Sequence, residues 1–424
     1  MNQNRDPISS PELIEALRRY NLLPAIVFLP TRRLCDEAAN DSTRETPQSE
    51  VSNKQTKRRQ IFDEFVEAYP EIRKHRHLRG LINAGIAAHH AGHMPPWKLL
   101  IEKMMTAGLL DAIFATSTVA AGVDFPARTV VISNADTRGK NGWNPLSASE
   151  LQQMTGRAGR RGRDNVGFIV LAPGRFQNPK RIAELLRAKP DALESRFRAT
   201  YTSLLNLLDA FGSFEQVRDI AARSFAYRNV TRGPELTNRI WMPFEQRARV
   251  LDHYGFLDLD SEKVTESGKW LADLRVDRPL LVGEAIRRGL FDGSQEHLAA
   301  GLIASVAADA DRDFGPWRIP GHLGELLSRF EEIVYEVSGV EWKNGIVPEE
   351  SINYSAAACA GLWAKGIAWN DLAGQANAEE GDLIRLFSRT GEALRQVAAL
   401  SSSNPAVAAL ARSAAASVLR PPLR

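Results

Sequence analysis

The chain has 424 residues, of which 44% are hydrophobic and 25% charged, and its formal net charge is +3. This length is too great for one ordinary core and predicts two to four domains. No stretch approaches the roughly 20 unbroken apolar residues that cross a bilayer, which excludes a membrane-spanning protein. Two cysteines cannot make a disulfide framework and the N-terminus has no apolar signal core, so we expect a cytoplasmic protein. The small net charge neither requires nor excludes a nucleic-acid partner.

Short β-type runs alternate with helical stretches through the first part of the chain. The β-type runs are Ala25–Leu29, Gly85–His90, Asp111–Thr116, Thr129–Asn134 and Gly167–Ala172. Several are nearly continuous in apolar residues, as strands buried on both faces are. The helical stretches are Arg32–Ala39, Lys57–His77, Pro96–Ala107 and Ser149–Ala158. This alternation predicts βαβ units and a parallel sheet. Ser147 and Glu150 predict a capping box at the start of the last helix.

A polar segment, Asn40–Arg59, interrupts the alternation. Its composition predicts a mobile surface insertion. The basic end, Lys54–Arg59, allows a contact with nucleic acid or a solvated helix face, and we favour the second. The preceding string Asp36-Glu37-Ala38-Ala39 superficially resembles a DEAD box, but it lies inside a helical stretch and we interpret it as a solvated helix face.

After about Ala172 the β signal fades, and leucine, valine and phenylalanine recur at helical spacing to the end of the chain. The fold class that we predict is therefore an α/β domain with a parallel sheet, followed by a mostly α-helical region in two or more bundled units.

The string with the strongest chemical signal is QMTGRAGRRG, Gln153–Gly162. On a helix, Gln153, Arg157 and Arg160 share one face. Gly156 and Gly159 weaken a helix by about 1 kcal/mol each, which indicates that something must approach the backbone closely. Two guanidiniums with no nearby acid suit a phosphate chain. The alternative, an arginine-rich surface helix, is less favoured because the string stands just before the last strand.

QMTGRAGRRG resembles motif VI of superfamily-two helicases, and residues 116–126 (TSTVAAGVDFP) resemble motif V. AIVFLPTRRLCDEAA resembles the motif IV region, and residues 85–132 are similar to the second RecA-like domain of the superkiller-type (Ski-like) DExH helicases. Downstream, ALESRFRATYTSLLNLL and RSFAYRN resemble the winged helix of that family, and WAKGIAWNDL and EEGDLIRL resemble its DSHCT-type bundle. The resemblance implies a connector helix over 1–20, a RecA-like domain over 21–175 with the insertion 40–59, a winged-helix region over 176–240 and a DSHCT-type bundle over 241–424.

The resemblance also implies roles for individual residues. Arg157 and Arg160 would be arginine fingers on the ATP γ-phosphate, and Gln153 would face the nucleotide. Further residues would bind ATP (Gly122, Asp124, Gly156) or nucleic acid (Thr116, Thr118, His90, Arg385). For Arg385, an ion pair with Asp382 is an equally good interpretation.

A helicase needs a P-loop, G-x-x-x-x-G-K-[ST], and an acidic pair that holds magnesium. The printed sequence contains neither string. The implied function is the C-terminal part of an ATP-dependent helicase that acts on a single strand of nucleic acid, with RNA favoured over DNA. ATP and Mg²⁺ would be used together with a P-loop-containing RecA-like domain, in cis or in trans, that supplies the magnesium ligands. We predict no efficient ATP hydrolysis without that domain. The alternative is a non-catalytic nucleic-acid- or protein-binding module derived from a helicase.

Two groups of residues have competing interpretations. We expect no metal at His89, His90 and His93, because adjacent residues point apart on a strand and no Cys or Asp completes the set. Four tryptophans could stack bases, but core or interface packing is favoured for each: Trp97, Trp143, Trp363 and Trp369.

Overall fold

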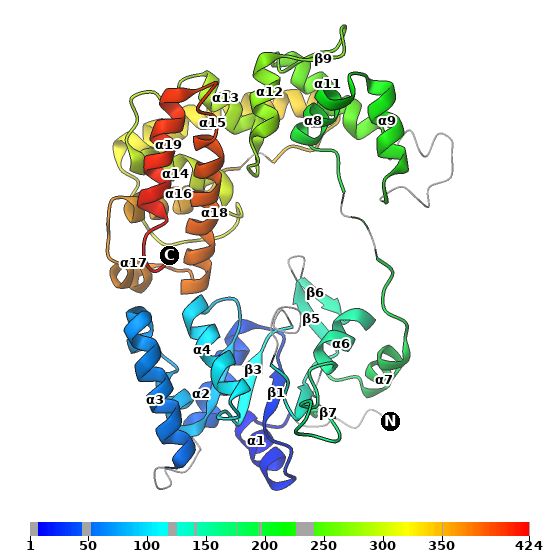
Figure 1. The fold of residues 1–424 in the computed structure, drawn as a ribbon, viewed down its shortest axis with the longest axis vertical. Coiled ribbons are helices and arrows are strands. Elements are labelled where there is room, and N and C mark those ends of the chain that lie inside the picture. Colours follow the sequence, from blue (N-terminus) through cyan, green and yellow to red (C-terminus); the bar gives the residue numbers. More distant parts are fainter. Residues whose placement is uncertain are drawn as a thin grey trace. The chain divides into compact units, whose positions relative to one another are not determined.

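The computed structural model describes residues 7–44, 52–117, 125–139, 142–174, 176–193, 195, 197–225, 241–349 and 351–423. The chain divides into two compact units, Met1–Ala192 and Leu193–Arg424. Figure 1 shows the ribbon of both units. Among the described residues, no helix combines the length and the apolar content that crossing a bilayer requires.

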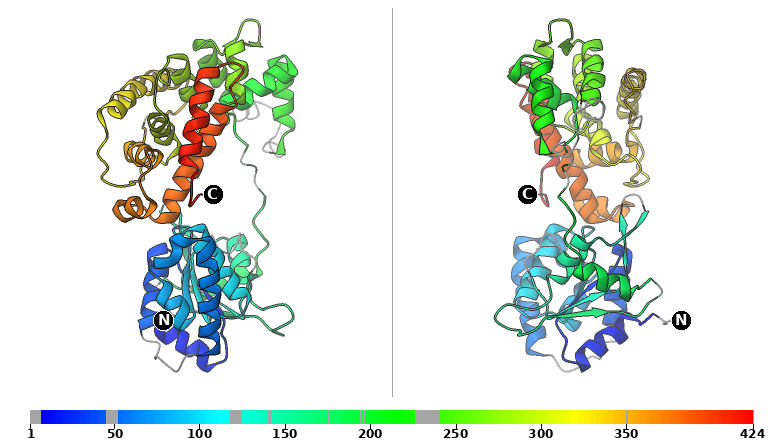
Figure 2. Two further views of the ribbon diagram at one scale, coloured as in Figure 1. Left: turned by 60° about the vertical axis from the view of Figure 1, so that its left-hand side comes forward. Right: turned by 90° about the vertical axis from the view of Figure 1, so that its right-hand side faces the viewer.

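The first unit is built on a five-stranded parallel sheet with the strand order β2-β3-β1-β4-β7. The predicted parallel sheet is confirmed, and each predicted β-type run contains one of its strands. The strands are β1 (Ala25–Phe28), β2 (Ile86–His89), β3 (Ala112–Ala115), β4 (Thr129–Ile132) and β7 (Phe168–Leu171). Every residue of β1 to β4 is buried, whereas β7, at the edge, is partly exposed. Such strands need cover on both faces, which the flanking helices provide (Figure 2).

Several helices of this unit begin at capping residues that the sequence offers. The predicted capping box of Ser147 and Glu150 is confirmed, and a second one, of Ser9 and Glu12, opens the first helix. The helical elements are α1 (Ser10–Arg19), α2 (Arg32–Arg44), α3 (Asn53–Ala68), the 3₁₀ turn η1 (Pro70–Lys74), the π turn η2 (Gly80–Ala84), α4 (Pro95–Thr106), α6 (Ala148–Thr155) and α7 (Pro179–Arg187). A hairpin of β5 (Asp136–Gly139) and β6 (Gly142–Pro145) precedes α6.

The prediction of a mobile insertion over 40–59 was wrong for most of that segment. α2 continues to Arg44 and α3 begins at Asn53 with Ser52 as its N-cap. Arg58, inside the predicted solvated basic end, is only 4% exposed. The polar composition misled because α2 is buried through small residues, including Cys35, Ala38 and Ala39.

The second unit is mostly helical, as predicted. Its helices are α8 (Tyr201–Phe211), α9 (Phe214–Arg223), α11 (Met242–His253), α12 (Glu266–Asp273), α13 (Pro279–Arg287), α14 (Glu296–Ala307), α15 (Gly321–Lys343), α16 (Tyr354–Ala364), α17 (Trp369–Gln375), α18 (Glu380–Ala398) and α19 (Pro405–Val418). One short hairpin joins α11 to α12, formed by β8 (Leu257–Asp258) and β9 (Lys263–Val264).

Small residues let the helices of the second unit approach closely. A Cβ at Gly301 of α14 would lie 3.0 Å from the carbonyl oxygen of Ala357 of α16. A Cβ at Gly391 of α18 would lie 2.4 Å from the Leu419 side chain, just after α19. The helices therefore pack so closely at these two positions that there is no room for a side chain.

Candidate nucleotide and nucleic-acid site

The arginine string Gln153–Gly162 forms a helix end and a loop. α6 ends at Thr155, so the prediction of a helix to Ala158, with Gln153, Arg157 and Arg160 on one face, was wrong. The loop is fixed to Ala127, two residues before β4, by two backbone hydrogen bonds. Ala127 N–H donates to the Arg157 carbonyl at 3.0 Å, and Gly159 N–H donates to the Ala127 carbonyl at 2.7 Å. Arg157 therefore stands at a fixed point beside the amino end of β4.

Glycines allow this arrangement. Gly159 has a φ of +91°, which a side chain would disfavour. A Cβ on Gly167, just before β7, would lie 2.5 Å from the carbonyl carbon and oxygen of Ala158. The glycines indicated a close approach to this backbone, and one group that approaches it is the backbone of Gly167.

Arg160 is paired with a carboxylate, contrary to the expectation of no nearby acid. Its Nε and Nη2 donate to the two oxygens of Asp164 at 2.7 and 2.9 Å. Arg128, before β4, donates to the same group at 3.2 Å. The Asp164 side chain is 1% exposed, and the hydrogen bonds from Arg160 lower its pKa to about 2. Arg160 thus has a built-in anionic partner, and Arg157 is partly buried.

Of the other residues predicted to bind the nucleotide, the structure describes two and leaves two outside its described ranges. Gln153 lies exposed in the last turn of α6, and Gly156 is the exposed C-cap of that helix. Both are close in the chain to Arg157, whose N–H donates to the Met154 carbonyl at 3.3 Å. Gly122 and Asp124 lie outside the described residues, as does Thr118.

Thr116 and His90 directly follow the carboxyl ends of β3 and β2, which are neighbours in the sheet. They therefore lie at the sheet edge opposite the amino end of β4, where the arginine loop is held. Thr116 is partly exposed. His90 is fully buried, and its Nε2 lies 3.1 Å from Asp36 Oδ1. A direct contact between the His90 ring and nucleic acid is not available in this arrangement.

Asp36 is the centre of a buried cluster that the sequence did not reveal. Its Oδ1 lies 2.7 Å from His77 Nε2 and 3.3 Å from His93 Nε2. Arg76 Nη2 donates to its Oδ2 at 2.7 Å. The interpretation of Asp36 as a solvated helix face was wrong, because its side chain is only 16% exposed and points into these rings.

Burial and hydrogen bonding set the charge states of Asp36 and His93 in this cluster. Burial alone would raise the pKa of Asp36, but the hydrogen bonds with His77, His90 and His93 outweigh it and hold that pKa well below its usual range. Burial lowers the pKa of His93 to about 3, against the opposing effect of Asp36. Asp36 therefore stays ionised while the His93 ring stays neutral.

The statement that no Asp completes the histidine set was also wrong. The ligand atoms of Asp36, His90 and His93 all lie within 4.8 Å of one another, which is short enough for a shared ion. However, Gly92 N–H donates to His90 Nδ1 at 3.1 Å. His90 Nδ1 is thus an acceptor, so His90 Nε2 carries the proton and donates to Asp36. This leaves no lone pair on Nε2 for a metal. Arg76 already places a positive charge at the same carboxylate, so these residues do not fit a metal well.

Comparison with known proteins identifies both units. Residues 48–162 match the family described as the helicase conserved C-terminal domain, and residues 261–423 match the DSHCT (NUC185) domain. The chain is 40% identical over 194 residues to the DExH-box ATP-dependent RNA helicase DExH15, chloroplastic, of Arabidopsis thaliana, covering 45% of this chain and 16% of that protein. It is 36% identical over 219 residues to superkiller complex protein 2 of Homo sapiens, covering 50% and 17%. It is 33% identical over 245 residues to the probable helicase HelY of Mycobacterium tuberculosis, covering 55% and 27%.

Both family matches and these relatives correspond to the C-terminal part of superkiller-type DExH helicases. The chain spans between 16% and 27% of the length of these curated relatives. The first unit is the C-terminal RecA-like helicase domain of this family, and the second carries its DSHCT domain.

In the DSHCT region, Arg385 lies on α18 and is exposed. Its alternative partner Asp382 is buried and forms its ion pair with Arg312. The interpretation of Arg385 as one half of an Asp382 pair is therefore wrong, and its guanidinium faces solvent.

The tryptophans of this chain fall into two groups. Trp97, Trp363 and Trp369 are buried, which confirms core packing. Trp143 on β6 is 56% exposed, which rules out core packing for that residue and leaves interface packing as a prediction. Its ring stacks on Phe176 with centroids 6.4 Å apart. Trp143 is therefore the one of the four that is open to a base.

Proposed function

We propose that this chain supplies the arginine fingers and part of the nucleic-acid path of an ATP-dependent RNA helicase. Arg157 and Arg160 would neutralise charge that develops on the γ-phosphate, and Gln153 and Gly156 would border the nucleotide. The β- and γ-phosphates and their Mg²⁺ would be held by a P-loop-containing RecA-like domain, in cis or in trans. Gly122 and Asp124 would complete the nucleotide side.

The observation that carries this proposal is the fixed loop beside Ala127. Backbone hydrogen bonds on both sides of Ala158 set the position of Arg157, independently of the flexible arginine side chain. Positioned donors of this kind stabilise a transition state because they need little reorganisation when the charge appears. A surface helix with solvated arginines would not need Gly167 to close the backbone against Ala158.

Thr116 supports the nucleic-acid side of the proposal. Together with Thr118 it would contact the strand at the carboxyl edge of the sheet, and the exposed Arg385 would contact it from the DSHCT domain. Buried His90 would act by positioning the turn after β2 through Asp36. The favoured substrate is RNA, since two of the relatives described above are named as an RNA helicase and a superkiller complex protein. A cytoplasmic location is part of the same proposal.

The test is the nucleic-acid-stimulated ATPase rate of the purified chain, alone and with a P-loop-bearing domain of a superkiller-type helicase. We expect no activity from the chain alone and measurable activity with the added domain. Arg157→Ala should lower that rate by about a thousandfold, the effect of losing an arginine finger. Arg161→Ala is the matched control, because Arg161 is an exposed arginine in the same loop, and it should change the rate less than twofold.

Two results would contradict the proposal. Activity of the mixture that is equal in Arg157→Ala and the control would favour the alternative, a non-catalytic module derived from a helicase. Activity of the chain alone that falls in Arg157→Ala would mean that a nonstandard phosphate site lies in this sequence.

A further inference from the structure

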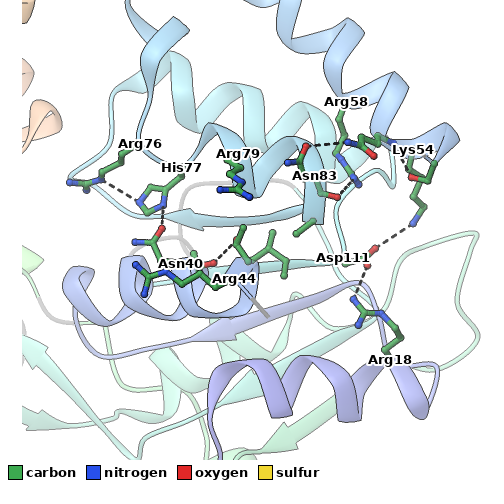
Figure 3. A pocket seen from close by; sticks show the side chains of 17 residues that line it. Arg18, Asn40, Arg44, Lys54, Arg58, Arg76, His77, Arg79, Asn83 and Asp111 are labelled. Carbon is green, nitrogen blue, oxygen red and sulfur yellow. Dashed lines mark hydrogen bonds and ion pairs between the residues drawn. The ribbon is translucent and has the colours of Figure 1, made fainter. Parts of the chain in front are cut away.

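A cationic pocket lies in the first unit, apart from the arginine loop and from Thr116, and Arg76 and His77 of the Asp36 cluster form part of its wall. Its volume is about 980 Å³, at the upper end of the range for small-ligand sites. Figure 3 shows its lining side chains, which come from α1, α2, α3 and the segment before β2. Asp111 and Ile86 place its floor at the amino ends of β3 and β2. Thr116 and His90 follow the opposite ends of these strands, and no residue of the arginine loop lines the pocket.

The charges of the lining are strongly unbalanced. Six lining residues are Arg or Lys and one is acidic: Arg18, Arg44, Lys54, Arg58, Arg76 and Arg79 against Asp111. That single carboxylate is shared, since Arg18 Nη2 lies 3.4 Å from one oxygen and Lys54 Nζ lies 3.5 Å from the other. Two of the cations also pair with carboxylates outside the lining, Arg18 with Glu15 at 2.8 Å and Arg76 with Asp36 at 2.7 Å. The excess of positive charge therefore rests on Arg44, Arg58 and Arg79.

One of the cations of the lining, Arg58, is buried. It is 4% exposed, and its guanidinium donates to the carbonyl oxygens of Ile82, Asn83 and Leu109 at 2.7, 3.1 and 2.8 Å. Among the described residues it has no carboxylate partner within hydrogen-bond distance. Burial lowers the pKa of Arg58, and the charge of Asp111 opposes that effect. Buried charges are normally paired, so this one is left to be balanced from the pocket.

Two arginines on the pocket wall are available to a ligand. Arg79 is exposed, and its guanidinium makes no hydrogen bond or ion pair with any residue that the structure describes. Arg44 has an 81% exposed side chain and only a loose pair with Asp41, at 3.9 Å. Neutral hydrogen-bonding groups lie between the cations, including Asn83, whose amide oxygen accepts from Gln55 Nε2 at 3.1 Å.

We propose that this pocket is a second anion site that binds a ligand with two or more phosphate groups. Arginine forks match phosphate oxygens in pairs, and several cations around one open pocket suit neighbouring phosphates better than one carboxylate. The phosphates come either from a free polyphosphate or from a nucleic-acid backbone. The site differs in position from the arginine fingers, so it does not depend on the proposed helicase role.

The test compares Arg44→Gln/Arg79→Gln with wild type, using the full chain and isothermal titration with tripolyphosphate at about 50 mM salt. Both residues are exposed, so folding should be unaffected. The control Arg73→Gln/Arg223→Gln removes two exposed arginines that do not line the pocket. We expect the double pocket variant to weaken binding at least tenfold and the control to change it less than twofold. Arg157→Ala should bind like wild type, which separates this site from the arginine loop.

A second arm uses a single-stranded RNA oligomer. If the backbone is the phosphate source, the pocket variant weakens RNA binding and lowers the slope of log affinity against log salt by about 1.4, which is two lost contacts, while tripolyphosphate binds poorly to wild type. Equal binding of both ligands to the pocket variant and the control would overturn the proposal. Tighter binding of a poly-aspartate peptide than of either phosphate ligand to wild type would also overturn it.

Discussion

Asp36 illustrates how one residue can hold distant parts of the chain together. A single carboxylate receives three imidazole rings and one guanidinium from positions 76 to 93. Taking an ionised carboxylate out of water is unfavourable, and here the surrounding donors compensate for it. Removing the carboxylate while its partners stay buried should be much more damaging than removing a surface charge.

We predict that Asp36→Asn lowers the free energy of unfolding by about 1–3 kcal/mol, the range for leaving buried hydrogen-bond donors without their acceptor. Urea denaturation of the chain, followed by its tryptophan fluorescence, measures this. Glu37→Gln is the control: its side chain is 48% exposed and pairs with Arg33 on the surface, so its effect should stay within about 0.5 kcal/mol. Equal effects of the two substitutions would mean that the cluster contributes nothing to stability.

The sequence contained no signal for this cluster. Asp36 sits in a helix that looks polar, and its partners lie about 40 to 57 positions away. Hydrophobic periodicity is blind to a helix face made of Cys35, Ala38 and Ala39, because these side chains are small and only weakly apolar. By contrast, the arginine string was found from sequence, since its residues are contiguous. Its conformation was not, because Gly167 and Asp164 act on it from outside the string.

At the scale of elements, strands were easy to predict and ends of helices were not. Each strand of the sheet is a run of four residues that are mostly apolar, a local property that fixes its place. The end of α6 depends on a contact between two backbones, Ala158 and Gly167, that no local pattern records. The prediction of a mobile insertion over 40–59 was wrong for a similar reason. Arg58, inside that segment, is anchored by carbonyls of η2 and of the turn before β3.

Gly167→Ala tests the contact that shapes the arginine loop. The added methyl would lie 2.5 Å from two atoms of Ala158, so the loop must move or strain must accumulate. We expect a loss of about 1–3 kcal/mol of stability, as for other overpacked positions, together with a lower ATPase rate in the complemented assay. Gly174→Ala is the matched control, because its nearest neighbour would be 4.0 Å away. A Gly167→Ala protein as stable as that control would refute the contact.

On the scale of the whole molecule, the two units are joined by an extended segment. Residues 188–200 contain no helix or strand where described, and Leu193 is 84% exposed. The sequence predicted a change of architecture near residue 172, from the fading β signal. The first compact unit continues to Ala192 because α7 packs on α6: Gln152 Nε2 donates to the Ala188 carbonyl at 2.9 Å, and Ile182 is fully buried.

We predict that fragments 1–192 and 193–424 fold separately, since each unit has its own internal packing. Each should unfold cooperatively in thermal denaturation followed by circular dichroism. The fragment 1–174 is the control: without α7 it exposes the underside of α6 and should melt several degrees lower than 1–192. A fragment 193–424 without a cooperative transition would show that the second unit depends on the first.

Arg160 is not an idle cation waiting for a ligand. Its fork is occupied by Asp164, a carboxylate that is itself buried and shared with Arg128. An incoming anion must therefore displace the Asp164 carboxylate, which is covalently part of the chain and always close to Arg160. A weakly charged or poorly aligned anion will lose that competition, whereas a phosphate group carrying extra negative charge can win it. If the loop acts as proposed, the carboxylate would set the anionic charge that a ligand needs to reach Arg160, and we expect Asp164→Asn to make the loop bind weaker anions.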